Sequence, residues 1–147
     1  MTRTSQGLNT ALTLALFLFP TAAVSQASPT AERETHCQSK SRSHESRVIV
    51  HGKLFASNGG GSGYRVWVVG TSRIVWLSKD IEPPVPADLE HAFTPFDEEL
   101  YGDFVIVSLE ADTPGKMREV CLVSGKSLVA RSVATGKSRR IRDGAHE

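Results

Sequence analysis

The amino-acid sequence predicts a mainly β domain, a small antiparallel barrel or sandwich of five to six strands with one short helix. Three observations lead to this fold class. Short β-branched and apolar segments follow one another closely between residues 47 and 133, turn-forming residues separate them, and strands do not alternate regularly with long helices. A chain of 147 residues fits one such domain.

The first 27 residues have the pattern of a signal peptide. Met1-Thr2-Arg3 gives a positive start, Ala11–Phe19 is an unbroken apolar run, and Ser25-Gln26-Ala27 places small side chains where a signal peptidase cleaves. We expect cleavage before Ser28, with cleavage after Ala23 as the alternative. The apolar segment is shorter than the roughly 20 residues of a spanning helix. We therefore expect a periplasmic or secreted protein with no membrane span after cleavage.

Residues 28–46 are polar and contain few large apolar side chains, so they predict a flexible leader. The β domain is expected over residues 47–133. Its first strand is Arg47–Phe55, in which Gly52 indicates a bulge or a sharp bend. A glycine-rich turn or loop follows at residues 58–63.

The clearest local pattern is a hairpin formed by residues 64–69 and 72–77. Gly70-Thr71 fits a two-residue type II′ turn. This pairing places Trp67 opposite Ile74 and Arg65 opposite Trp76 on one face of the hairpin. The other face is aliphatic and is expected to belong to the core.

The remaining elements follow from turn and strand patterns. Residues 87–93 fit a short helix after Pro86, and strands are expected at residues 104–109, 117–123 and 127–133. Residues 134–147 carry no apolar pattern and predict a basic, disordered tail. Closely spaced strands of this number favour an OB-like barrel, in which five strands form a partly open Greek key.

Basic and acidic residues balance once residues 1–27 are removed, because that segment contains Arg3 and no acid. A neutral domain lacks the field that captures nucleic acid. The charges are unevenly spread, however, since every ionised side chain from Asp80 to Asp112 is acidic and residues 137–142 are basic. The simpler interpretation is a solvated acidic flank with a frayed tail. The alternative is a tail that docks on this flank or on an anionic envelope polymer.

Two cysteines, Cys37 and Cys121, are expected in a compartment that oxidises thiols. A disulfide between them is the natural inference, although Cys37 lies in the polar leader. His36 and His44 beside Cys37 do not supply the four closely spaced ligands of a structural zinc site. We expect no metal site and no cofactor.

The candidate binding residues are Arg65, Trp67, Arg73 and Trp76. An exposed aromatic face on a small barrel is a usual place for sugars or extended polymers to stack. Arg65 over Trp76 would form a cation–π contact. The competing interpretation is that the helix of residues 87–93 covers this face and that both tryptophans are core residues. No catalytic constellation is present; the carboxylates of residues 97–103 fit a solvated edge.

The sequence resembles a group of small uncharacterised secreted proteobacterial proteins. The resemblance covers roughly residues 48 to 130 and is carried by residues 51–54, 64–67, 69–73, 101–104 and 117–122 (HGKL, YRVW, VGTSR, YGDF and MREVCL). It implies neither an activity nor a site. Proteins of this group often have a second cysteine at the position of Val107, which implies that a Cys37–Cys121 bond is either a local replacement or absent.

The sequence as a whole predicts a non-enzymatic exported barrel that binds an unknown envelope component or a protein partner. One alternative is a small hydrolase or modifier of cell-wall material that uses the acidic segment of residues 97–103. The other is a structural or stress-related accessory protein without a small ligand.

Overall fold

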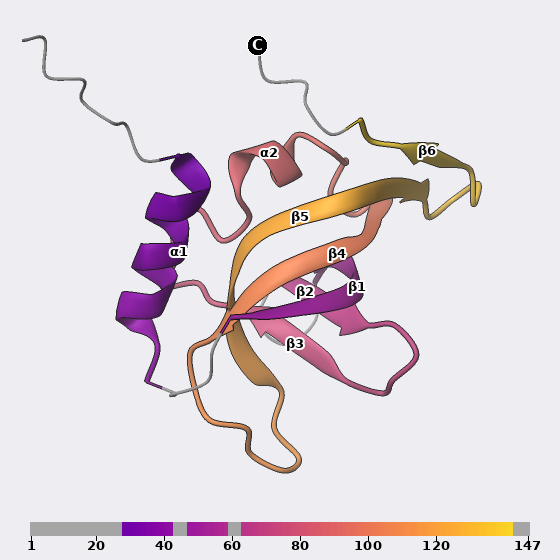
Figure 1. The fold of residues 1–147 in the computed structure, drawn as a ribbon. Helices are drawn as coiled ribbons and strands as arrows, with labels where there is room; N and C mark the ends of the chain where they lie inside the picture. The colour runs from indigo at the N-terminus through magenta and orange to yellow at the C-terminus, as the bar shows by residue number, and fades with distance from the viewer. Residues whose placement is uncertain (1–27, 43–46, 59–62, 143–147) are drawn as a thin grey trace, which may run out of the picture.

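The computed structural model describes residues 28–42, 47–58 and 63–142. The expected signal peptide, His44 and most of the glycine-rich loop lie outside the described residues. Within these described residues, six strands and two helices follow one another (Figure 1). They are α1 (Pro29–Lys40), β1 (Val48–Ser57), β2 (Gly63–Val68), β3 (Ile74–Leu77), α2 (Ala87–Glu90), β4 (Glu98–Ser108), β5 (Arg118–Ser132) and β6 (Ser138–Arg140).

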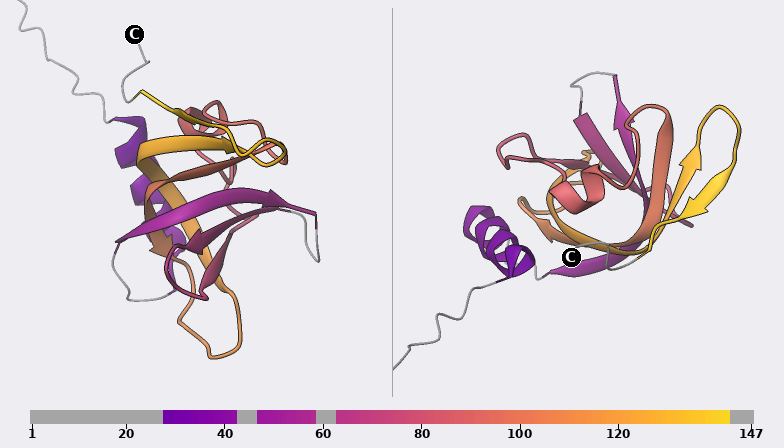
Figure 2. Two further views of the ribbon diagram at one scale, coloured as in Figure 1. Left: turned by 90° about the vertical axis from the view of Figure 1, so that its right-hand side faces the viewer. Right: turned by 90° about the horizontal axis from the view of Figure 1, so that it is seen from above.

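The strands form one sheet in the order β3-β2-β1-β4-β5-β6, and β3 also pairs with β5. These pairings link β1, β2, β3, β5 and β4 into a ring, with β6 added outside it on β5 (Figure 2). Only the β3–β5 pairing is parallel; the other described pairings are antiparallel. The predicted mainly β fold is confirmed, and the ring is consistent with a small barrel or sandwich.

The main core fills the interior of this ring. Alternation along the strands directs Leu54, Val66, Val75, Leu100 and Phe104 inward, and all five are buried. Leu89, Ala92 and Phe93, from α2 and the turn after it, join the same core. The segment around α2 therefore covers one end of the ring (Figure 2).

The hairpin of β2 and β3 has the predicted register. Arg65 pairs with Trp76, and Trp67 pairs with Ile74. The turn is different, because the Thr71 N–H donates to the Val68 carbonyl at 3.2 Å and Gly70 has a φ of 80°. A positive φ at this third position is a requirement of a type II turn, so the predicted type II′ turn is wrong while Gly70 keeps its role.

Gly52 marks a close approach inside the ring. The register of β1 continues through Gly52 on both sides, so no bulge interrupts it there. A Cβ atom at this position would lie 2.7 Å from Val66 Cγ1. The strand therefore needs glycine where it curves across the core.

The structure differs from the predicted flexible leader, because α1 occupies Pro29–Lys40. Ser28 caps it, with its hydroxyl accepting from the Ala31 N–H at 3.3 Å. Cys37 is bonded to Cys121, with their Cα atoms 5.7 Å apart. The disulfide lies in a second apolar cluster, between α1 and the outer side of β4 and β5, which comprises Cys37, Ile81, Val105, Val107, Leu109, Cys121 and Val123. Neither described helix is long and apolar enough to cross a membrane.

The C-terminal part of the chain contains more strand structure than predicted. β5 is one strand in place of the two expected ones, and its pairing with β4 is irregular between Tyr101 and Asp103. The tail is not disordered throughout, because β6 pairs with β5 and Ile141 packs against the main core. Arg139 donates to Glu98 at 2.7 Å and to the Ala92 carbonyl at 2.9 Å. The tail thus docks on the acidic flank.

Candidate functional site

The outward-facing residues of β1, β2, β3 and β4 form the candidate site. Lys53 of β1 pairs with Trp67 of β2 on one side and with Tyr101 of β4 on the other. In the next outward row, Arg65 lies between Phe55 and Trp76. We call the four rings, Phe55, Trp67, Trp76 and Tyr101, the outer aromatic face.

Both tryptophans are half-buried, and neither belongs to a buried core cluster. The expected covering helix lies elsewhere: α2 packs on the interior end of the ring, where Phe93 meets Tyr64 edge-on at 6.4 Å between ring centroids. The interpretation of Trp67 and Trp76 as core residues under this helix is therefore wrong. Trp67 is held in place by its indole N–H, which donates to the Thr71 carbonyl at 2.6 Å.

A polar group lies at the centre of the outer aromatic face. The Lys53 ammonium forms an ion pair with Glu99 at 2.6 Å and lies 5.4 Å from the centroid of the Trp67 ring and 5.1 Å from that of Phe55. The Tyr101 hydroxyl donates to the second oxygen of Glu99 at 3.0 Å. Both charged side chains are largely screened from solvent, which strengthens the pair relative to an exposed one.

A groove of about 400 Å³ borders this face at the start of β2 and the end of β3. Its lining includes Tyr64, Arg65, Trp76, Lys79 and Met117. Burial, with a smaller contribution from nearby Glu90, raises the pKa of the Tyr64 phenol, so its hydroxyl stays protonated. The groove thus combines aromatic walls with the cationic heads of Arg65 and Lys79.

A second groove of about 620 Å³ lies at the other end of β3, between the β2–β3 hairpin and the β4–β5 loop. Arg73 lines it together with Asp112 and Met117. Arg73 forms an ion pair with Asp112, which also accepts from Arg118 at 2.8 Å. The carboxylate therefore neutralises part of the positive charge of this groove.

The structure thus brings Arg65, Trp67 and Trp76 together and places Arg73 at the rim of the face. Sequence reasoning missed Lys53, Phe55 and the contributions of β4. Lys53 and Phe55 alternate with Leu54 in the first expected strand, so the period of two could have placed them on one face. Glu99 and Tyr101 carried no such signal, because the expected strand there began only at residue 104.

The carboxylates of the acidic segment, residues 97–103, do not converge on one site, because three of them bind three different basic side chains. Glu98 bonds Arg139, Glu99 bonds Lys53, and Asp103 accepts from His51 Nδ1 at 2.8 Å. The hydrogen bonds from the Arg139 side chain and from the Thr94 N–H lower the pKa of Glu98. These carboxylates serve structural ion pairs, which gives no support to the hydrolase alternative.

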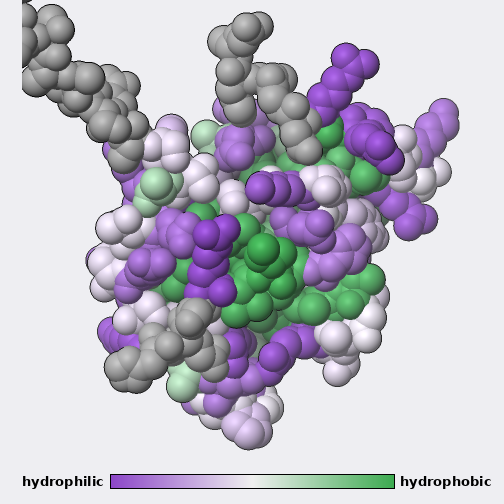
Figure 3. Space-filling view, viewed as in Figure 1, coloured by the Kyte–Doolittle hydropathy of each residue, from purple (hydrophilic) through white to green (hydrophobic). Residues whose placement is uncertain are grey.

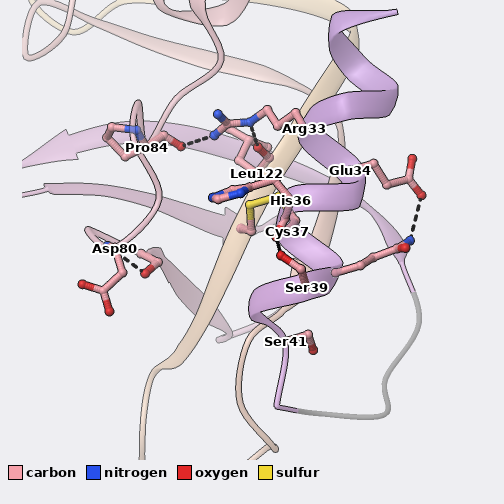
Figure 4. Close-up of a disulfide and its surroundings, with 12 residues drawn as sticks. Arg33, Glu34, His36, Cys37, Ser39, Ser41, Asp80, Pro84 and Leu122 are labelled. Carbon is pink, nitrogen blue, oxygen red and sulfur yellow. Dashed lines mark hydrogen bonds between the residues drawn. A yellow bond between two sulfur atoms is a disulfide. The ribbon is translucent and has the colours of Figure 1, made fainter. Parts of the chain in front are cut away.

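Cys37 is unavailable as a metal ligand because it forms the disulfide (Figure 4). Among the residues that the structure describes, no three His, Cys, Asp or Glu side chains gather closely enough to hold a metal ion. In comparisons with known proteins, no family model, no curated protein and no solved structure matches this chain.

Proposed function

We propose that this chain is an exported, non-catalytic binding module with an OB-like fold, and that an extended saccharide of the cell envelope binds its outer aromatic face. The observation that carries the proposal is the pair of half-buried tryptophans on adjacent strands, beside a groove and covered by neither of the helices that the structure describes. Burial of aromatic rings is favourable, so a module without a ligand gains nothing from leaving two tryptophans partly in water.

The strand order supports the OB-like fold. An OB barrel closes by pairing β1 with β4 and β3 with β5, and both pairings are present here. α2 lies between β3 and β4 in the chain, as the helix of that fold does. OB folds bind oligonucleotides and oligosaccharides on the face of their second and third strands, which here carries Trp67 and Trp76.

The chemistry of the face favours a saccharide over a nucleic acid. Pyranose rings present flat patches of C–H groups that stack on indole and phenyl rings, while their hydroxyls need both donors and acceptors. Lys53 and Tyr101 supply donors, and Glu99 supplies acceptor oxygens beside the rings. A nucleic-acid site would instead need an excess of positive charge along its whole length.

The location of the protein supports an envelope ligand. The N-terminal pattern of residues 1–27 predicts export, and the Cys37–Cys121 disulfide is stable in an oxidising compartment such as the periplasm. Periplasmic or secreted localisation makes envelope polymers the ligands that the domain meets.

Titration of the exported protein with soluble β-1,4-linked amino-sugar oligomers tests the proposal. We expect binding, protection of tryptophan fluorescence from acrylamide, and at least about fivefold weaker binding by Trp76→Ala, since one stacked ring contributes on the order of 1–3 kcal/mol. Phe96→Ala is the matched control, because it removes an exposed aromatic ring outside the face. Absence of any saccharide binding, or equal losses in both variants, would contradict the proposal.

A further inference from the structure

Two exposed arginines, Arg131 of β5 and Arg140 of β6, border the outer aromatic face at its end away from β3. We propose that this pair, the cationic edge, binds a carboxylate carried by the saccharide, so that the module prefers an acidic glycan to a neutral one. The inference rests on the proposed function and narrows its class of ligand.

Strand pairing carries the outer aromatic face across β5 to β6. Residues that pair directly in neighbouring strands lie on the same side of the sheet. One such row crosses five strands and consists of Trp67, Lys53, Tyr101, Val129 and Arg140. Neighbouring strands are about 4.8 Å apart, so roughly 10 Å separates the main chains of Tyr101 and Arg140. A saccharide that stacks on the aromatic rings and continues along this row therefore reaches Arg140.

Arg131 belongs to the adjacent row on the same side of the sheet. It follows Val129 by two residues in β5, and strand residues at this spacing point to the same side. Ala130, which separates the two, is buried in the main core. The guanidinium groups of Arg131 and Arg140 are therefore both on the outer side, at the same end of the face.

The other arginine of β6 has a different role. Arg139 pairs with the buried Ala130, and its side chain donates to Glu98 at 2.7 Å. Alternation thus directs Arg139 to an acid of the protein itself and Arg140 to the outer side. The basic segment of residues 137–142 docks on the acidic flank through one arginine and leaves the next one for a ligand.

The carboxylate opposite Arg131 is already engaged. Glu99 pairs with Arg131 across β4 and β5, but it bonds Lys53 through one oxygen and accepts from Tyr101 through the other. Among the residues that the structure describes, no carboxylate forms an ion pair with Arg131 or Arg140. An incoming carboxylate therefore displaces no internal ion pair at this edge. Its planar shape matches the fork of a guanidinium, which donates two parallel hydrogen bonds to it.

Two probes with the same β-1,4-linked backbone test the inference. One is chitohexaose, which is neutral; the other is a peptide-free glycan hexasaccharide in which every second sugar carries a lactyl carboxylate. We expect the acidic oligomer to bind about tenfold more tightly at low salt, and the difference to shrink as salt rises.

The outcomes separate this inference from the proposed function. Equal binding of both probes, or weaker binding of the acidic one, overturns the inference and leaves the proposed function standing. Binding of neither probe overturns both. Tighter binding of a thymidine hexanucleotide than of the acidic oligomer would assign the cationic edge to a nucleic acid and overturn the inference as well.

Charge variants locate the effect. Arg131→Gln combined with Arg140→Gln should bring the affinity for the acidic probe down to that for chitohexaose. The control, Lys40→Gln combined with Lys116→Gln, removes the same net charge from exposed positions on α1 and in the β4–β5 loop. α1 lies on the opposite side of the molecule from β6 (Figure 2).

A single variant guards against a folding defect. Arg140→Gln changes one exposed side chain on the three-residue strand β6 and should by itself reduce the preference for the acidic probe. A preference that survives in the double variant of the cationic edge, or that disappears equally in the control, overturns the inference.

Discussion

The two outer sides of the ring differ in how far other parts of the chain cover them. On β4 and β5, outward-facing Val105, Val107 and Val123 are buried beneath α1 and the segment around Ile81. On β1, β2 and β3, the outward-facing rings stay half-buried, and no described helix packs on them. Figure 3 shows apolar residues reaching the surface at the centre of the face that Figure 1 presents.

The covered side is closed by specific bonds that hold α1 in place. α1 is a polar helix whose one buried residue is Cys37, so apolar packing alone does not hold it. The disulfide holds it, and so does Arg33, whose side chain donates to the Leu122 carbonyl at 2.6 Å and to the Pro84 carbonyl at 3.0 Å (Figure 4). Specific bonds therefore cover the apolar side at β4 and β5, whereas the aromatic side stays accessible. This difference supports a binding role for the outer aromatic face.

Removal of the disulfide should produce the largest effect. The double variant Cys37→Ala and Cys121→Ala opens a loop of 84 residues. The expected loss is about 4 kcal/mol in the free energy of unfolding, mainly through a less constrained unfolded chain. Urea denaturation measures it.

Hydrogen exchange in the same variant separates the two sides of the ring. The Arg42 amide, which donates to the Leu109 carbonyl at 2.9 Å, should lose protection as α1 detaches. Saccharide binding should persist, because α1 packs against β4 and β5 around the disulfide, whereas Trp67 and Trp76 lie on β2 and β3. Loss of binding in a variant that is still folded would mean that the two sides are coupled.

Arg33→Met should have the next largest effect. Methionine keeps an apolar stem, but the Leu122 and Pro84 carbonyls lose a charged donor, which costs about 2 kcal/mol. Burial lowers the pKa of the Arg33 guanidinium, with Asp88 opposing, and the group remains charged. Lys40→Met, an exposed change on the same helix, is the control and should be nearly neutral. Equal small effects of both variants would show that the disulfide alone fastens α1.

Sequence reasoning succeeded where alternation alone decides the structure. The period of two along residues 64–77 fixed the hairpin register, because a slip by one residue would have buried Arg65. It failed at α1, whose polar side chains carry no apolar stripe and whose docking depends on a residue 84 positions away. The Cys37–Cys121 bond itself was inferred from the two cysteines and the expected compartment, but the local pattern did not indicate that the segment around Cys37 forms a helix.

The candidate site was predictable only in its hairpin half. Arg65, Trp67 and Trp76 lie within one local unit, so pairing rules placed them together. Glu99 and Tyr101 join the face through the pairing of β1 with β4, which is a property of the whole topology. The partners of Arg73 and Lys53 likewise come from distant strands or loops, and only the structure identifies Asp112 and Glu99.

The ion pair of Glu98 and Arg139 joins β4 to β6. Its removal should have the smallest effect on the free energy of unfolding, and the larger effects can be compared with it. The hydrogen bonds that lower the pKa of Glu98 stabilise its ionised form. Its contribution is therefore fully present above pH 4.5, the ordinary value for this carboxyl, and is lost as pH falls through the lowered pKa.

Glu98→Gln should reduce the free energy of unfolding by about 0.5 kcal/mol at pH 7, as expected for an exposed pair. This gap between variant and wild type should close under acid conditions, as followed by urea denaturation at a series of pH values. Glu82→Gln, at an exposed carboxylate outside this pair, is the control for the loss of one negative charge. A gap that is independent of pH would assign the docking of the tail to β6 pairing and Ile141 packing alone.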